Sequence, residues 1–319
     1  MPSRAWRWRG FSVQVGVPDG TVDRLRRRGT TTGDVAQPGR LVFRDPPALN
    51  VAYRDAEAAL AFREVATSKG REAAEQLTAD DGDLLAQVRG LSWYHTIELP
   101  GGVVTPGQFD HRELLARYGF PARLDGKRAL DVATFNGFWA FHMESLGADV
   151  VAIDLDDPKD WDFPTPLQPH VESMADQAPI GRGFQIASAA LGSKVQRVGR
   201  SVYDLDPDVD GTFDFVHCGD VLVHLRRPLR ALEAIRSVTT GELLLSDGID
   251  LDLPRGAFGP TTQYLGGWDD VVWWVPSLDA LAQMAVDAGF RDVRVNCVYN
   301  LAKTYESEGF WRVSLTAVV

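Results

Sequence analysis

Short apolar runs alternate with helix-like segments along the C-terminal two thirds of this chain of 319 residues. Runs of this kind, bounded by turn-forming residues, are typical of strands buried in a sheet. The predicted strands cover residues 128–133, 149–155, 195–203, 213–219, 242–249, 293–299 and 311–319.

Helix signals lie between these runs, and the three clearest predicted helices cover residues 137–146, 228–238 and 278–288. Gly147 and Gly289 follow the first and third, where glycine suits the residue just past a helix. Pro228 is tolerated as the first residue of the second helix. Ser277 is a typical N-cap for the third. Strands that alternate with helices predict a largely parallel, doubly wound α/β sheet.

The end of the chain departs from that alternation. Only the segment LAKTYESEGF separates the last two predicted strands, which indicates an antiparallel hairpin that closes the sheet. A plain dinucleotide-binding fold does not predict such a hairpin.

Upstream of the sheet the chain divides into two zones, so that three regions are expected: 1–90, 91–125 and 126–319. The first is a loop-rich extension with predicted helices over 53–66 and 69–78, and it serves either as a lid or as an oligomer contact. The second is a connector in which Pro-Gly pairs interrupt any regular element. The third is the domain that carries the sheet.

Composition and charge narrow the class of protein. The hydrophobic fraction of 45% suits a globular core, and no apolar stretch reaches the roughly 18 residues of a membrane span. The N-terminus lacks the apolar core of a secretion signal, so a cytoplasmic protein is expected. Cys218 and Cys297 predict neither a disulfide framework nor a zinc site, and the six histidines form no metal-ligand cluster. The net charge of −11 disfavours non-specific nucleic-acid binding, although arginines within 4–28 leave a local RNA contact open.

The turn after the first predicted strand, DVATFNG over 131–137, indicates the cofactor. Dinucleotides require a GxGxxG loop that lets the backbone approach a pyrophosphate. Here Ala133 stands where the first glycine is expected, and only Gly137 is kept. S-adenosylmethionine has no phosphate, so it needs a close turn without an anion-binding loop. An oxidoreductase is therefore disfavoured.

Two further markers follow in order. Asp154 ends the second predicted strand, where a carboxylate accepts hydrogen bonds from both ribose hydroxyls. Val202 and Tyr203, after the third strand, are placed to flank an adenine ring. The alternatives are that Asp154 begins a solvated acidic loop and that Tyr203 belongs to the core.

These motifs give the chain a resemblance to the class I S-adenosylmethionine-dependent methyltransferases. Within them it resembles the group around the bacterial tRNA wobble-uridine methyltransferases and carboxymethyltransferases. The resemblance rests on WYHTIELPGGVVTPGQFD, LDGKRALDVATFNGFWAFHMESLGADVVAIDLDD, FDFVHCGDVLVHLRRPLRALEAIRSV and WWVPSLDALAQMAVDAGF. It implies a Rossmann-like sheet of seven strands in the order 3-2-1-4-5-7-6, with strand 7 antiparallel. It also implies that residues around 93–95 close over the cofactor. With it, the predicted cofactor contacts are Trp93, His95, Asp131, Ala133, Thr134, Phe135, Asn136, Gly137, Asp154, Leu155, Val202, Tyr203, Cys218 and Gly219.

Two departures separate the chain from the tRNA enzymes. It shows no counterpart to the basic residues that hold a carboxylated cofactor, and an acidic insert lies between 154 and 181. We therefore expect a methyltransferase for a small, partly apolar metabolite. A tRNA wobble-uridine modification enzyme is the alternative, and a protein that binds S-adenosylmethionine without methylating is an alternative of another class.

Deprotonation of an oxygen or carbon acceptor requires a base matched to neutral pH. His224, just past the fourth strand, is the first candidate, because histidine titrates near pH 7. Asp220 and Glu172 are further candidates. Each candidate has a non-catalytic alternative. In these alternatives, His224 holds its loop, Asp220 is a solvated loop acid and Glu172 lies at an exposed helix start.

The predicted acceptor-binding residues are largely aromatic. They lie on the first helix, in a proline-rich insert over 156–183 and in a long segment after the fifth strand, where loops often carry binding residues. The alternative is core packing for the aromatic residues, solvation for the arginine and an exposed helix start for the histidine. They are Trp139, Trp161, His170, Arg226, Tyr264, Trp268, Trp273 and Trp274.

Overall fold

The computed structural model describes residues 82–167, 180–253, 260–268, 271–305 and 309–319. All of these belong to one compact unit. The helices expected over 53–66 and 69–78 fall outside the described residues, as do His170 and Glu172.

The strands of the described part are β1 (Trp93–His95), β2 (Gly107–Phe109), β3 (Arg128–Val132), β4 (Asp149–Asp154), β5 (Gln196–Gly199), β6 (Phe213–Gly219), β7 (Thr239–Gly248), β8 (Thr262–Tyr264), β9 (Trp274–Pro276), β10 (Arg291–Ala302) and β11 (Gly309–Val318). The α-helices are α4 (Gly82–Arg89), α5 (Leu115–Tyr118), α6 (Phe138–Ser145), α8 (Arg182–Leu191), α9 (Pro207–Asp210), α10 (Pro228–Val238) and α11 (Leu278–Asp287). The 3₁₀ helices are η1 (Pro100–Gly102), η2 (Arg112–Leu114), η3 (Pro158–Asp160), η4 (Thr165–Leu167), η5 (Val202–Asp204) and η6 (Leu222–His224).

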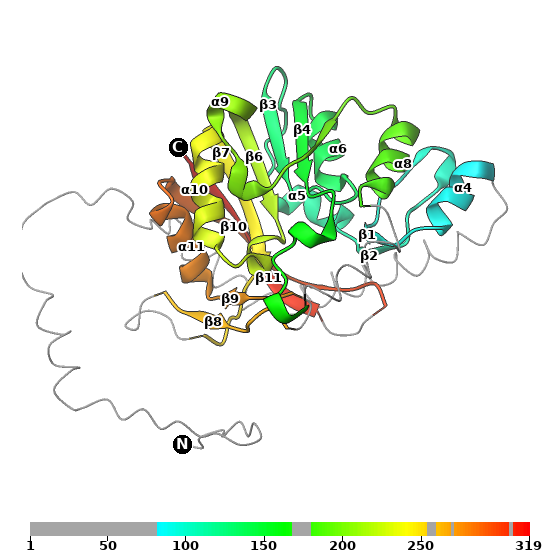
Figure 1. Cartoon of the computed structure of the whole chain (residues 1–319). Coiled ribbons are helices and arrows are strands. Elements are labelled where there is room, and N and C mark those ends of the chain that lie inside the picture. Colours follow the sequence, from blue (N-terminus) through cyan, green and yellow to red (C-terminus); the bar gives the residue numbers. More distant parts are fainter. Residues whose placement is uncertain (1–81, 168–179, 254–259, 269–270, 306–308) are drawn as a thin grey trace, which may run out of the picture. The chain divides into compact units, whose positions relative to one another are not determined.

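Seven strands form the central sheet in the order β10-β11-β7-β6-β3-β4-β5 (Figure 1). When these seven strands are numbered 1 to 7 along the chain, their order read from the β5 edge is 3-2-1-4-5-7-6. Strand 7 is β11, which runs antiparallel to both of its neighbours. The predicted topology and the closing hairpin are therefore confirmed. This arrangement brings the carboxyl ends of β3, β4, β5 and β6 to one edge of the sheet, where ligands bind in open α/β folds.

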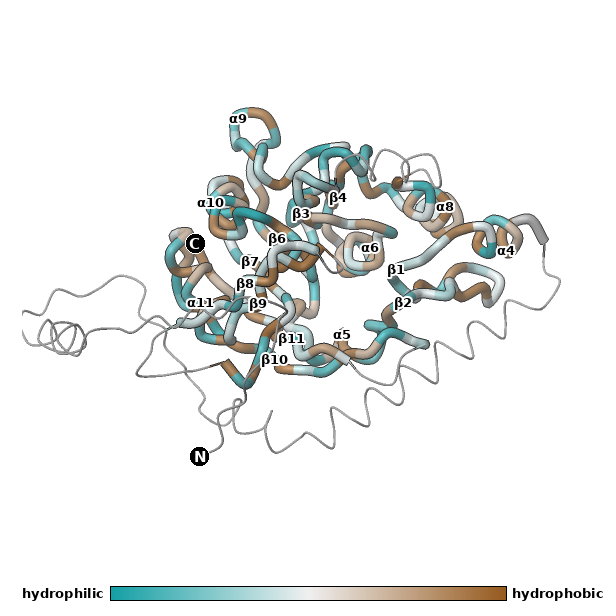
Figure 2. The backbone as a smooth tube through the Cα atoms, turned by 60° about the horizontal axis from the view of Figure 1, so that its bottom comes forward, coloured by the Kyte–Doolittle hydropathy of each residue, from teal (hydrophilic) through white to brown (hydrophobic). Residues whose placement is uncertain are grey.

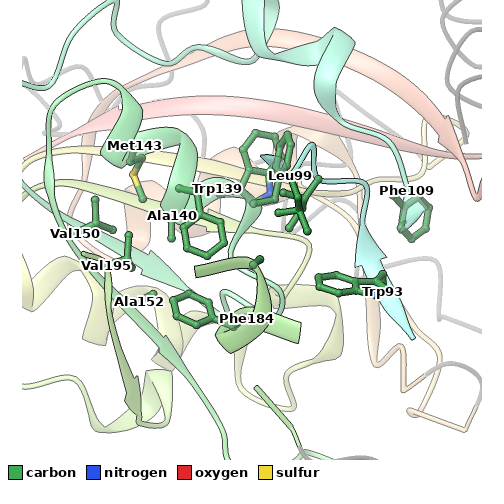
Figure 3. Packing of buried hydrophobic residues seen from close by; sticks show 14 of the residues in the cluster. Trp93, Leu99, Phe109, Trp139, Ala140, Met143, Val150, Ala152, Phe184 and Val195 are labelled. Atoms are coloured by element: carbon green, nitrogen blue, oxygen red, sulfur yellow. The ribbon is translucent and has the colours of Figure 1, made fainter. Parts of the chain in front are cut away.

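Helices cover both faces of the sheet, α6 and α8 on one and α10 and α11 on the other (Figure 1). Successive strand residues point to opposite faces, so Leu244 packs with the first pair of helices while Leu243 and Leu245 pack with the second. Figure 2 shows apolar segments gathered around β6 and β7. On the first face, Trp139 of α6 packs in the same buried cluster as Phe184 of α8 (Figure 3).

Local signals explain where the helices begin and end. The Ser277 side chain accepts a hydrogen bond from the Ala280 amide at 3.1 Å and so caps α11. Pro228 is the first residue of α10. Gly147 and Gly289 follow α6 and α11 with φ of 99° and 100°, in the left-handed region that favours glycine. These sequence predictions are confirmed to within a few residues.

Two expectations were wrong. The third strand ends at Gly199 rather than at 203, because the Ser201 hydroxyl accepts a hydrogen bond from the Tyr203 amide and bends the chain into η5. The connector over 91–125 is not free of regular structure, since β1 and β2 pair in parallel across its Pro-Gly turns.

Candidate functional site

A cavity of about 270 Å³ opens at the carboxyl ends of the parallel strands. Most of the predicted residues on these strand ends contribute to its lining. The predicted residues that line it are His95, Ala133, Phe135, Trp139, Asp154, Leu155, Trp161, Val202, Tyr203, Gly219, Asp220 and His224.

The turn between β3 and α6 has an unusual backbone. Ala133 and Phe135 have φ of 58° and 48°, and Gly137 has φ of 91°. Left-handed conformations are costly for residues that carry a Cβ, and they often mark functional sites. A Cβ at position 137 would lie 2.5 Å from the Phe141 ring, so only glycine fits there. The missing first glycine therefore changes the side chain at Ala133 but not the glycine-like conformation of the turn.

Asp154 holds that turn from the end of β4. One carboxylate oxygen accepts a hydrogen bond from the Phe135 amide at 2.7 Å, and the other accepts one from the Leu155 amide at 2.8 Å. Burial raises the pKa of Asp154 to about 6, so the group is ionised at neutral pH. A carboxylate has about four acceptor positions, which leaves capacity for the two hydroxyls of a ribose.

The wall beside Asp154 is formed after β5. Val202 is buried, and Tyr203 is held by a hydrogen bond from its hydroxyl to Asp162 at 2.5 Å. Both side chains line the cavity together with Ile153. This apolar and aromatic surface suits the flat face of an adenine ring.

The segment before the sheet closes the cavity from the other side. The Asn136 side-chain oxygen accepts a hydrogen bond from the Tyr94 amide at 2.7 Å and thereby fastens β1 to the turn. Tyr94 and His95 then line the cavity. The buried Nδ1 atom of His95 has no hydrogen-bond partner among the described residues. Burial lowers the pKa of His95 well below its usual value, so the ring is neutral.

The polar groups of the cavity match the functional groups of S-adenosylmethionine. The spare acceptor positions of Asp154 match ribose hydroxyls, and the unpartnered Nδ1 of His95 can bond to a polar tail. The lining includes four carboxylates, Asp154, Asp160, Asp162 and Asp220. Such a lining repels a pyrophosphate and attracts a cationic sulfur. The residues present therefore fit the sulfonium cofactor better than a dinucleotide.

The other predicted cofactor residues do not line the cavity. Trp93 donates from its indole nitrogen to the Val88 carbonyl, and Cys218 is fully buried in the sheet. Asp131 accepts a hydrogen bond from His217 Nδ1 at 2.8 Å. Thr134 is buried with its hydroxyl unpartnered among the described residues.

A buried ion pair, which the sequence did not reveal, lies at one end of the cavity. Asp220 accepts hydrogen bonds from Arg312 Nε at 2.8 Å and from the Tyr94 hydroxyl at 3.2 Å. The Nε2 atom of His111 lies 3.8 Å from the same carboxylate. Burial by itself would raise the pKa of Asp220, but Arg312 and His111 outweigh it and hold that pKa well below its usual range. Asp220 is thus a permanent charge and a weak base.

His224 is better placed to accept a proton. It lies on η6 and lines the cavity, with Nδ1 3.4 Å from the Val271 carbonyl oxygen. A carbonyl oxygen only accepts, so Nδ1 is the donor in this bond. The buried carboxylate of Asp247 fixes the start of η6 by accepting a hydrogen bond from the Leu222 amide at 2.6 Å.

The predicted acceptor-binding residues in the described part of the chain divide into three groups. Trp139 and Trp161 line the cavity, as described above. Trp273 and Arg226 instead hold the cavity rim, since the indole nitrogen of Trp273 donates to the Asp162 carbonyl and the Arg226 guanidinium donates to the Phe163 carbonyl. The remaining three lie on the β8–β9 hairpin and its turn and do not line the cavity: Tyr264, Trp268 and Trp274.

Within the described part of the chain, no group of three or more histidine, cysteine or acidic side chains is arranged to hold a metal ion. None of the helices in that part of the chain has the length and apolar character needed to cross a membrane.

Residues 109–295 match a family model described as a methyltransferase domain. The tRNA U34 carboxymethyltransferase of Pseudomonas putida strain GB-1 is 31% identical over 173 residues, which are 54% of this chain and 48% of that protein. The enzyme of the same name from Pseudomonas fluorescens strain SBW25 is 28% identical over 203 residues, 58% of this chain and 51% of that protein. The chain thus spans about half the length of the curated relatives it matches.

Solved structures of similar fold include two with bound SAH. The N-terminal domain of EvdMO1 with SAH bound has a TM-score of 0.47 and 16% identity, covering 74% of this chain and 95% of that one. Magnesium protoporphyrin IX methyltransferase from Synechocystis PCC 6803 with bound SAH has a TM-score of 0.41 and 14% identity, covering 81% of this chain and 97% of that one.

Proposed function

We propose that this chain, which belongs to the methyltransferase domain family and has the class I S-adenosylmethionine-dependent fold, methylates a small, partly apolar metabolite. The observation that carries the proposal is the shared cavity, where the ribose-binding carboxylate of Asp154 and the basic histidine, His224, line one space. Its volume of about 270 Å³ lies just below the range of small-molecule sites, roughly 300–1,000 Å³.

Each lining residue has a role that follows from its position. Asp154 accepts hydrogen bonds from the ribose, and Val202 and Tyr203 hold the adenine. Trp161 covers the cavity and excludes water, which strengthens electrostatic interactions inside. When bound, S-adenosylmethionine supplies an electrophilic methyl group on a cationic sulfur.

His224 Nε2 accepts the proton of the acceptor as its oxygen, nitrogen or carbon becomes nucleophilic. General-base catalysis of this kind contributes about 10²- to 10⁴-fold to a rate. Alignment of acceptor and methyl by the rigid strand ends supplies the larger part.

The charge of the cavity favours a neutral or cationic acceptor. Arg200 is the one guanidinium among the described lining residues, and its Nε lies 2.9 Å from the Asp210 carboxylate, which neutralises it. A carboxylated cofactor or a phosphate-rich acceptor would face the lining carboxylates of Asp154, Asp160 and Asp162, whereas Asp220 is paired with Arg312. The alternative, a tRNA wobble-uridine carboxymethyltransferase, is favoured by the names of the curated relatives and disfavoured by this lining.

The acceptor class is tested with S-adenosylmethionine labelled in its methyl group. The protein is incubated with total tRNA in one reaction and with a metabolite extract below about 1 kDa in another, each with and without RNase. We expect label in the small-molecule fraction, unchanged by RNase. Label in RNase-sensitive material supports the tRNA alternative. Binding of S-adenosylhomocysteine without turnover in either reaction supports a non-methylating binding protein.

A further inference from the structure

Asp162 receives hydrogen bonds from three segments that are distant in the sequence. The Tyr203 hydroxyl donates to Oδ2 of Asp162 at 2.5 Å, and the Arg226 amide donates to the same oxygen at 2.8 Å. The indole nitrogen of Trp273 donates to the Asp162 carbonyl at 2.7 Å. The next residue, Phe163, accepts a fourth bond from the Arg226 guanidinium.

The segment around Asp162 has little regular structure of its own. It runs between the short 3₁₀ helices η3 and η4. Asp160 and Trp161 nevertheless line the cavity, and the Trp161 ring stacks on Phe163 at 5.8 Å between centroids. The bonds to Asp162 and Phe163 therefore fix this wall of the cavity.

The donors belong to the two functional ends of the site. Tyr203 flanks the predicted adenine position, and its hydroxyl also accepts a hydrogen bond from the Arg227 amide at 3.2 Å. Arg226 and Arg227 follow His224 along the same loop, and the Arg227 guanidinium lies 4.6 Å from the centre of the Tyr203 ring. Asp162 is thus shared between the cofactor end and the loop of the candidate base.

We propose that Asp162 is a positioning residue that fixes the Trp161 wall and couples cofactor binding at Tyr203 to the position of the His224 loop. The proposal rests on the proposed function for the identity of the two ends. The coupling runs through one carboxylate oxygen, because both the Tyr203 hydroxyl and the Arg226 amide converge on Oδ2. A network with a shared acceptor responds as a unit when that acceptor is removed.

This geometry separates an acceptor role from a charge role. The amide oxygen of Asp162→Asn can occupy the position of Oδ2 and accept both bonds, whereas Asp162→Ala removes the acceptor. Asp157→Asn is the matched control, because it removes one negative charge from the same segment and keeps the oxygen that accepts from the Lys159 amide. Asp157 does not line the cavity.

Hydrogen–deuterium exchange of the full chain, with and without S-adenosylhomocysteine, tests the coupling. In the wild type, the product should slow exchange in peptides over 131–137, 158–167 and 222–227 together. In Asp162→Ala, exchange over 158–167 and 222–227 should rise about tenfold or more, as expected for loss of hydrogen bonds to a charged group. The product should then protect 131–137 alone. Asp162→Asn and Asp157→Asn should behave as the wild type.

Three results would overturn the proposal: wild-type exchange in Asp162→Ala, equal disturbance in the Ala and Asn variants, or a wild-type response confined to 131–137. Absence of protection at every peptide would instead count against the cofactor site itself. If Asp162→Ala does not fold, Tyr203→Phe keeps the ring and removes the hydroxyl that donates to Oδ2 of Asp162. It should then raise exchange over 158–167, and unchanged exchange in that variant refutes the proposal.

Discussion

The Nε atom of Arg312 on β11 lies 2.8 Å from the carboxylate of Asp220 at the end of β6, so the pair spans β7, the strand between them. Both side chains are largely buried. Asp220 is held in a left-handed conformation with φ of 51°. The pair thus fixes a strained loop beside the cavity and explains why this acid serves as a fixed charge.

Arg312→Met should destabilise the fold by about 3 kcal/mol at pH 7, because it leaves a buried carboxylate unpaired. The folded-state pKa of Asp220 is depressed in the wild type, so the stability it adds is present above about pH 4 and lost as pH falls through the folded pKa. The gap between wild type and variant should therefore be full at pH 7 and narrow below pH 4. Urea unfolding at several pH values measures it.

The double variant Asp220→Asn with Arg312→Met should lose less stability than the sum of the single variants, since it removes both charges together. Arg123→Met is the matched surface control. Its partner Asp125 is exposed, and we expect no measurable change. Equal effects of the two Arg→Met variants would contradict a structural role for the buried pair.

Asp154→Ala should weaken binding of S-adenosylhomocysteine about 10- to 100-fold, because hydrogen bonds to a charged group contribute about 1.5–3 kcal/mol. The pKa of Asp154 is about 6 in the free protein, and the ionised form is the better acceptor. Affinity in the wild type should therefore be constant above pH 7 and fall below pH 6. Calorimetry across this range measures both effects.

Asp154→Asn supplies the control for the pH dependence. It keeps one acceptor oxygen and does not titrate, so its affinity should be lower at pH 8 and flat between pH 8 and 5. A wild-type pH profile in this variant would show that another group controls the dependence.

Ala133→Gly should stabilise the protein by up to about 1 kcal/mol, because alanine at φ of 58° carries a left-handed cost that glycine lacks. Gly137→Ala should destabilise it by more than about 2 kcal/mol, because its Cβ would overlap the Phe141 ring. Ala189→Gly, on the exposed side of α8, controls for glycine entropy and should cost up to about 1 kcal/mol. Urea midpoints rank the variants, and a destabilised Ala133→Gly would contradict the strain.

The sequence was sufficient for the topology because strand and helix periodicities are local signals. Ser277, Pro228 and the glycines after α6 and α11 fixed the helix ends within a few residues. The turn was also partly predictable, since the missing glycine at Ala133 was visible. The sequence does not show that the backbone at this turn keeps the glycine-like conformation. That conformation depends on the Asp154 carboxylate, which accepts a hydrogen bond from the Phe135 amide.

The rest of the site depends on contacts between distant segments. Asp220 was predicted as a second base, and nothing near it in the sequence indicates that Arg312 pairs with it. Trp273 was expected to touch the acceptor, but its indole bonds to Asp162, 111 residues earlier. Such pairings follow from strand order and loop paths, which periodicity does not encode.

His224→Ala should lower kcat about 10²- to 10⁴-fold, the range for loss of a general base. The affinity for S-adenosylhomocysteine should stay within about twofold of the wild type, because the proposed ribose and adenine contacts lie on β4 and η5. The residual rate should rise with pH without a plateau, since hydroxide replaces the lost base. His142→Ala, on α6 and outside the cavity lining, is the control and should keep wild-type kcat and affinity. If His224 only held its loop, product affinity and amide exchange over 222–227 would change with kcat, and wild-type turnover in His224→Ala would exclude it as the base.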